Sequence, residues 1–80
     1  MKKTLTLFIR HGCHLCEAFR EELYACKEQW QFVVEEVDID SNPALEEKYG
    51  TRVPVLADND EELCQYFLDP VRLKTYFEQS

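Results

Sequence analysis

The sequence predicts an α/β fold in which a four-stranded mixed sheet is flanked by three helices, in the order β-α-β-α-β-β-α. First, short apolar runs with strand character alternate with amphipathic stretches of helical period. Second, a helix lies between the first two strands, which implies a right-handed parallel crossover. Third, the Asp58-Asn59-Asp60 turn between the last two strands implies an antiparallel hairpin.

The composition is that of an ordinary globular domain, with 45% hydrophobic and 31% charged residues. Eighty residues suffice for one small core, so we expect a single domain over residues 1–80. The formal net charge of −7 argues against a nucleic-acid partner, because phosphate binding needs a basic face. No apolar segment is long enough to cross a bilayer, so we expect no membrane association.

The first residues resemble the start of a signal peptide, because Met1-Lys2-Lys3 precedes an apolar run. That run is too short, however, and it reaches Arg10 without a cleavage site of small residues. We therefore expect a cytoplasmic location. Reducing conditions there disfavour structural disulfides, so the four cysteines are not interpreted as a disulfide framework.

The first strand is predicted over residues 4–10, with Phe8 on one face and three aliphatic side chains on the other. An amphipathic helix follows over residues 14–29, and its other polar residues, including Arg20, should face solvent. Its core-facing residues recur at spacings of three and four: Leu15, Phe19, Leu23 and Cys26. We accordingly interpret Cys26 as a small buried hydrophobe.

The second strand is predicted over residues 32–39, near a sheet edge because two glutamates interrupt it. Asn42-Pro43 should begin a short helix that ends at Gly50. Residues 53–56 are the predicted third strand, and residues 61–66 are its hairpin partner.

Asp69-Pro70 should begin the last helix, because an aspartate caps a helix start and proline suits the first helical position. The buried side of this helix is predicted to consist of Val71, Leu73, Tyr76 and Phe77.

Two cysteines separated by two residues lie where the first strand is followed by the first helix. A helix start offers free N–H groups and a positive dipole end, which favour a thiolate. The dipole alone is too weak, so we expect hydrogen bonds from Leu15 N–H, Cys16 N–H and the Cys16 thiol, with the Arg10 charge nearby. We interpret Cys13 as the nucleophile and Cys16 as the resolving thiol.

Other interpretations of these residues remain open. Cys13 and Cys16, with His11 and His14 beside them, resemble half of a zinc site, but a second ligand pair is not visible and we predict no metal. His14 either stabilises the Cys13 thiolate as an imidazolium or is an exposed residue with little influence. Cys64 is either a buried strand thiol or a site for a disulfide with a partner.

Two motifs together resemble the thioredoxin superfamily. They are Cys13-His14-Leu15-Cys16 after the first strand and Arg52-Val53-Pro54-Val55-Leu56 at the third. With one strand before the first motif, the chain more narrowly resembles the small bacterial glutaredoxin-like proteins, over essentially its whole length. The resemblance implies a thioredoxin/glutaredoxin-like fold and a thiol–disulfide oxidoreductase that needs no metal or organic cofactor.

The resemblance also implies roles for single residues. Cys13 corresponds to the attacking thiol and Cys16 to the resolving thiol. Arg10 occupies the position where glutaredoxins commonly have a lysine that contacts the glutathione carboxylate. Val53 precedes Pro54, the expected cis-proline, and offers its backbone to a substrate. We place Arg10, Val53, Pro54 and His14 among the substrate-binding residues.

The chain also departs from the glutaredoxin pattern. Glutaredoxins follow their second hairpin strand with a Gly-Gly pair and an aspartate that hold the γ-glutamyl end of glutathione, whereas residues 63–69 here are Leu-Cys-Gln-Tyr-Phe-Leu-Asp. The tryptophan before the thioredoxin motif and the Gly-Pro inside it are missing too. Weak use of glutathione is therefore expected.

We expect a monomer that exchanges disulfides with a protein or with glutathione and is returned to the dithiol by glutathione or a reductase. The alternative is a binding module of the same fold whose cysteines hold zinc or share an iron–sulfur cluster.

Overall fold

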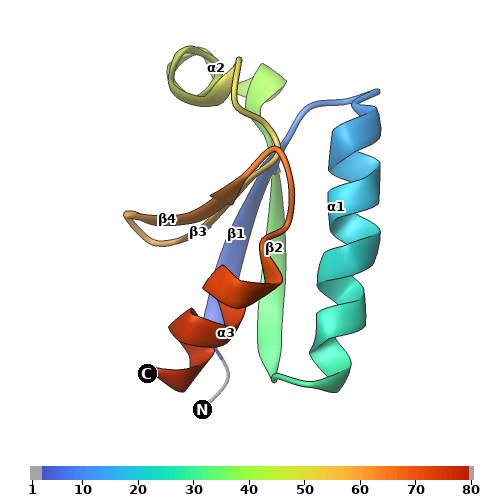
Figure 1. The fold of residues 1–80 in the computed structure, drawn as a ribbon. Coiled ribbons are helices and arrows are strands. Elements are labelled where there is room, and N and C mark those ends of the chain that lie inside the picture. Colours follow the sequence, from blue (N-terminus) through green and yellow to red (C-terminus); the bar gives the residue numbers. More distant parts are fainter. Residues whose placement is uncertain (1–2, 80) are drawn as a thin grey trace.

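The computed structural model describes residues 3–79, so Met1 and Lys2 of the signal-like start lie outside the described residues. The elements are β1 (Lys3–Ile9), α1 (His14–Ala25), η1 (Cys26–Glu28), β2 (Phe32–Asp38), η2 (Ile39–Ser41), α2 (Pro43–Tyr49), β3 (Val55–Asp58), β4 (Glu61–Gln65) and α3 (Pro70–Glu78). Three α-helices surround one sheet (Figure 1). The predicted fold class is confirmed.

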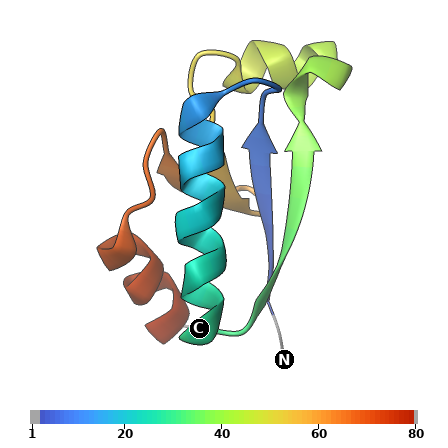
Figure 2. The ribbon, with the colours of Figure 1, turned by 90° about the vertical axis from the view of Figure 1, so that its right-hand side faces the viewer.

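The sheet has the strand order β2-β1-β3-β4. β1 and β2 run parallel, and α1 returns the chain between them (Figure 2). β3 pairs antiparallel with β1 and with β4, so the sheet is mixed as predicted. β2 is an edge strand, in agreement with the glutamates that interrupt its sequence.

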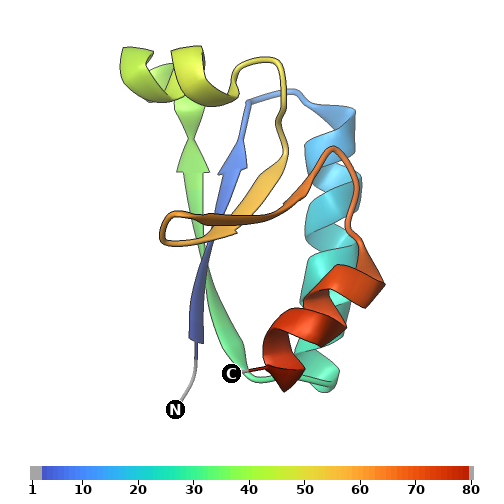
Figure 3. The same cartoon turned by 60° about the vertical axis from the view of Figure 1, so that its left-hand side comes forward.

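The main core lies between the sheet and the helices α1 and α3. Its strand residues include Leu5, Leu7 and Leu56, which are fully buried, and its helix residues include Phe19 and Leu73. Figure 3 shows α3 alongside α1 on this side of the sheet. Most of the buried hydrophobic residues in the described part of the chain lie on this face.

A smaller cluster covers the opposite face of the sheet. Ile39, Tyr49 and Val55 are buried there, and the ring of Phe8 stacks on Tyr49 with centroids 4.2 Å apart. Phe8 therefore points away from the leucines of β1, as the period-two alternation predicted.

Two predicted core residues are instead exposed. The buried stripe of α1 runs through Cys16, Phe19 and Leu23, and Leu15, one residue round the helix, is 39% exposed. Val71 is 73% exposed because it lies two residues before Leu73, on the far side of α3. The predictions for Leu15 and Val71 were wrong.

Several element boundaries also differ from those predicted. α1 ends at Ala25, and the chain tightens into the 3₁₀ turn η1 before β2. β3 begins at Val55 because Pro54 has no N–H to give to the sheet. None of the helices in residues 3–79 is both long and apolar enough to cross a membrane.

The exposed position of Val71 can be tested by measuring the unfolding free energy of variants in α3. Leu73→Ala should lower the free energy of unfolding by about 2–5 kcal/mol, because it removes a fully buried side chain and leaves a cavity. Val71→Ala, on the same helix, should change it by less than about 0.5 kcal/mol. Urea unfolding followed by circular dichroism measures both. Equal losses would show that α3 presents a different face to the core.

Candidate active site

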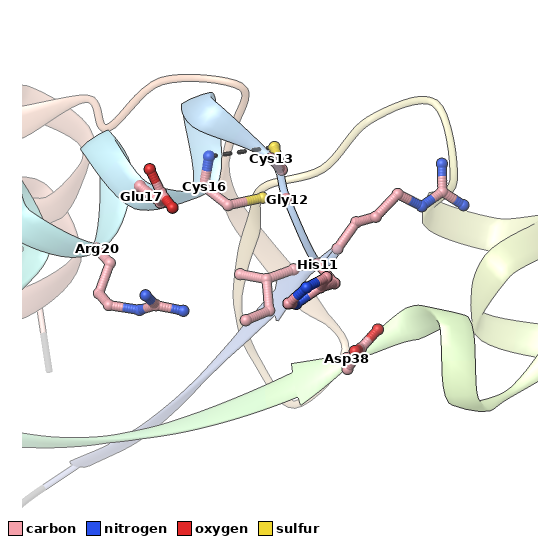
Figure 4. Close-up of a pocket in the computed structure, with 9 residues that line it drawn as sticks. His11, Gly12, Cys13, Cys16, Glu17, Arg20 and Asp38 are labelled. Atoms are coloured by element: carbon pink, nitrogen blue, oxygen red, sulfur yellow. Dashed lines mark hydrogen bonds between the residues drawn. The ribbon is translucent and has the colours of Figure 1, made fainter.

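Cys13 is the N-cap of α1, so its side chain lies at the positive end of the helix. Its backbone is extended (φ −90°, ψ 116°), and its Sγ accepts a hydrogen bond from Cys16 N–H at 3.2 Å (Figure 4). Gly12 makes the preceding turn with φ +76°, a region that glycine enters without strain. The turn places the sulfur where a helix N-cap oxygen normally sits.

Cys16 lies under Cys13 and is only 2% exposed. Burial is the largest cause that raises its pKa, to about 11, and a hydrogen bond from its thiol to Cys13 adds to the rise. A main-chain hydrogen bond from Arg10 and the charge of Arg20 act in the opposite direction. At neutral pH Cys16 is therefore a protonated thiol that donates to Cys13.

A pocket of about 400 Å³ opens beside the two sulfurs (Figure 4). Its lining comes from the end of β1, the following turn, α1 and the end of β2: Ile9, Arg10, His11, Gly12, Cys13, Cys16, Glu17, Arg20 and Asp38. Asp38 reaches it because β1 and β2 are parallel, so their carboxyl ends meet at one edge of the sheet.

The helical pattern predicted that Arg20 faces solvent, and no pocket role was predicted for Asp38. A signal for both was present: Arg20 is four residues after Cys16, one turn along the same helix face. Asp38 ends the strand parallel to the one that carries the cysteine motif.

The side chain of Arg10 is bound by groups on η2 and α2. Its Nε donates to Asp40 Oδ1 at 3.0 Å, a terminal nitrogen lies 3.7 Å from Glu46 Oε1, and another donates to Gly50 O at 3.3 Å. The guanidinium charge is thus neutralised by two carboxylates. Arg10 supports the dithiol through its main chain rather than through the nearby free charge that we expected.

His14 points into solvent. Its side chain is 98% exposed, and its Nδ1 lies 3.9 Å from Glu17 Oε2. Of the two interpretations drawn from the sequence, this geometry favours the exposed residue over a stabiliser of the Cys13 thiolate.

Val53 and Pro54 lie on the β3 side of the site, away from the pocket on the β2 side. The bond between them is cis, the isomer expected from the sequence, and Pro54 is almost fully buried. Because Phe8 pairs with Val55 in antiparallel register, Pro54 lies beside the end of β1, where the chain turns toward Cys13. Figure 3 shows this loop at the same end of the sheet as the start of α1.

The segment after β4 differs in structure as well as in sequence from the glutaredoxin pattern. Tyr66 has φ +68°, in the left-handed region that favours glycine, and its hydroxyl donates to Thr51 O at 2.7 Å. Asp69 Oδ1 caps α3 by accepting from Val71 N at 3.0 Å and Arg72 N at 3.2 Å. The side chains at these two positions are thus engaged within the fold.

The other two cysteines are part of the core. Cys64 is 7% exposed, and Cys26 is partly buried against the main cluster. Burial is the largest cause that raises the pKa of each thiol. The structural interpretation of Cys26 and Cys64 agrees with this placement.

In this geometry the motif offers a metal ion two ligands at most. Within residues 3–79, no group of three or more histidine, cysteine, aspartate or glutamate side chains is arranged to hold a metal ion.

Comparison with known proteins places this chain in a family. The family model of the glutaredoxin-like domain (DUF836) matches residues 4–78. Protein Ne2328 from Nitrosomonas europaea, a solved structure, is 38% identical with a TM-score of 0.85, over 95% of this chain and 92% of that one. Protein XcR50 from X. campestris is 37% identical with a TM-score of 0.69, over 95% and 97%.

A more distant solved structure extends the likeness. A mutant thioredoxin from Halobacterium salinarum NRC-1 is 28% identical with a TM-score of 0.63, over 95% of this chain and 72% of that one. A search of curated proteins gives no match. Because the family model spans nearly the whole length, and the helices and sheet are those of a thioredoxin-like fold, the chain belongs to the glutaredoxin-like domain family.

Proposed function

We propose that this protein is a thiol–disulfide oxidoreductase that works through Cys13 and Cys16. Its family and its thioredoxin neighbour support a redox function in general. The observation that carries the specific proposal is the asymmetry of the two thiols. Cys13 accepts hydrogen bonds at a helix start, whereas Cys16 is buried, protonated and hydrogen-bonded to it.

The exchange takes place in two steps. The Cys13 thiolate attacks one sulfur of a substrate disulfide, which forms a mixed disulfide and releases the other substrate sulfur as a thiolate. Cys16 then loses its proton to solvent and attacks Cys13. The Cys13–Cys16 disulfide forms, and the second substrate thiol leaves reduced. A reductant that supplies two electrons, either glutathione or a reductase, restores the dithiol.

The substrate is a disulfide in a protein or a mixed disulfide with glutathione. Val53 lies next to the end of β1, where its backbone groups can pair with an extended substrate segment as an added strand. Arg10 would reach a substrate carboxylate only by giving up an acceptor such as Gly50 O. His14, fully exposed at the rim, can contact a docked partner.

The remaining parts of the proposal follow from the chemistry. One chain holds both cysteines, so a monomer suffices, and the exchange itself uses no metal or organic cofactor. A dithiol that must be reduced between turnovers is suited to the cytoplasm, where reducing conditions also keep Cys26 and Cys64 as thiols.

We expect Cys13 to be alkylated faster than the other three cysteines. At pH 6.5, limiting iodoacetamide should modify Cys13 first, because its sulfur accepts from Cys16 N–H at the helix start, whereas burial raises the pKa of each of the other three thiols. With a pKa of about 11, Cys16 should gain reactivity only above about pH 10. Peptide mass mapping gives the order of labelling, and Cys13→Ser should lose the fast phase. Faster labelling of Cys26 or Cys64 would contradict the assignment.

The division of roles predicts which variant traps substrate. Cys16→Ser should accumulate a mixed disulfide at Cys13, because the second step has lost its nucleophile. Cys13→Ser should trap little. Intact mass spectrometry after mixing with a disulfide-bonded protein distinguishes them, and equal trapping by both variants would reject the two-step assignment.

Glutathione should be a poor reductant for this site. Residues 63–69 lack the Gly-Gly pair of glutaredoxins, and Asp69 Oδ1 already accepts from two helix N–H groups, so the charge-assisted grip on the glutathione γ-glutamyl end is incomplete. A charge-assisted hydrogen bond of this kind contributes about 1.5–3 kcal/mol, so activity should be at least about tenfold below that of a glutaredoxin assayed in parallel. NADPH consumption coupled to glutathione reductase measures this. Comparable turnover would show that another part of the site holds glutathione.

A further inference from the structure

Arg20 lies in the pocket instead of facing solvent as the helical pattern predicted. It follows Cys16 by four residues on α1, so both side chains are on one face of the helix and line the same cavity. Figure 4 shows its side chain reaching from α1 toward β2, below Cys16 and Glu17. Its side chain is 35% exposed.

The Arg20 guanidinium is fixed at one end and unpaired at another. A terminal nitrogen pairs with Glu36 Oε1 at 2.8 Å, and Glu36 Oε2 accepts from Tyr24 at 2.5 Å. The Tyr24 bond, and then Arg20, lower the pKa of Glu36, so this anchor is charged at neutral pH. Arg20 Nε is buried, yet it has no hydrogen-bond acceptor in the part of the chain that the structure describes. A buried charged donor without an acceptor calls for an explanation.

The second step of the exchange creates a negative charge on Cys16, in the pocket that Arg20 also lines. Cys16 must become a thiolate to attack, and its burial opposes that change. In the mixed disulfide Cys13 carries no charge, so its contributions to the pKa of Cys16 end. Burial then still raises the pKa of Cys16, whereas the Arg10 main-chain hydrogen bond and the Arg20 charge lower it.

The other charged groups around the pocket are already paired or exposed. The Arg10 guanidinium is bound by Asp40 and Glu46 on η2 and α2. On β2, Asp38 accepts from Asp40 N–H.

Glu17, on α1, is more than two-thirds exposed and lies near His14. His11 is exposed in the turn before the helix. Arg20 is therefore the pocket cation whose charge is best placed to act on Cys16.

We propose that Arg20 is a positioning residue that acts through Cys16, stabilising negative charge on its sulfur while it attacks the mixed disulfide. The inference rests on the proposed function. In this step the Cys16 proton goes to solvent, the Cys13–Cys16 bond forms, and the bond from Cys13 to the substrate sulfur breaks. The substrate thiolate leaves with the electron pair and takes a proton from solvent.

The test separates the two steps by single-turnover kinetics in a Cys26→Ala background. One equivalent of 2,2′-dithiodipyridine, a disulfide that is uncharged before it reacts, releases its chromophore in two phases. The first depends on reagent concentration and reports attack by Cys13. The second is independent of concentration and reports resolution by Cys16.

Arg20→Gln should slow the second phase about three- to tenfold at pH 7 and shift its pH profile upward, while the first phase changes little. Arg20→Lys keeps the charge and should retain most of the rate. Arg72→Gln is the matched control, because Arg72 is equally exposed and pairs with Glu61 at 2.8 Å outside the pocket. It should behave as the parent protein does.

Glu36→Gln gives a prediction of opposite sign. It removes the carboxylate charge that neutralises Arg20, so the second phase should become about two- to threefold faster. A structural defect would not accelerate a step. Thermal melting of each variant identifies any loss of fold.

Three results would overturn the proposal. The second phase of Arg20→Gln could keep the parent rate and pH profile, Arg20→Lys could be as slow as Arg20→Gln, or Glu36→Gln could fail to accelerate. Failure of the proposed function itself looks different, because the parent protein would then lack the concentration-independent phase.

Discussion

The site depends on one hydrogen bond, from Cys16 N–H to the Cys13 sulfur at the start of α1. It makes a sulfur the N-cap of a helix, which couples the reactivity of a thiol to the existence of the helix. The buried stripe of α1 begins at Cys16 itself, so the resolving thiol is held by the same packing that fixes Phe19 and Leu23. Chemistry and core therefore share a residue. The helix cannot shift relative to the sheet without moving the dithiol.

The mixed sheet determines what surrounds that bond. β1 is central and ends at the motif, with β2 parallel on one side and β3 antiparallel on the other. The parallel partner brings its carboxyl end, with Asp38, to the pocket, whereas the antiparallel partner brings its start, with Pro54. The dithiol thus has a polar side and a backbone side. A substrate segment can pair with the backbone next to Pro54, while the charged side chains of the pocket lie on the other side of the dithiol.

The sequence predicted the elements well because local signals mark them: Asn42 and Asp69 accept from the helix N–H groups they were expected to cap, and Leu5 and Leu7 are buried by their alternation. The predictions failed where the burial or the partners of a side chain depend on how the elements pack together. Leu15 was predicted to lie in the core because it precedes Phe19 by four residues, but Cys16 precedes Phe19 by three, and the packed stripe begins there. The partners of Arg10 are 30 to 40 residues away in sequence, so no local pattern could show that its charge is neutralised.

Arg10 and Arg20 differ in how many partners they have. Both line the pocket of a protein with net charge −7, in which acidic partners are abundant. Arg10 is held by two carboxylates and a carbonyl and ties the end of β1 to α2. Arg20 has one carboxylate and one buried, unpaired N–H. Its charge is therefore only partly cancelled, and it lies one helical turn from the thiol whose deprotonation is hardest. A cation that two carboxylates already neutralise would stabilise a transient anion only weakly. Arg20 pairs with one carboxylate, so its remaining charge can stabilise a thiolate at Cys16.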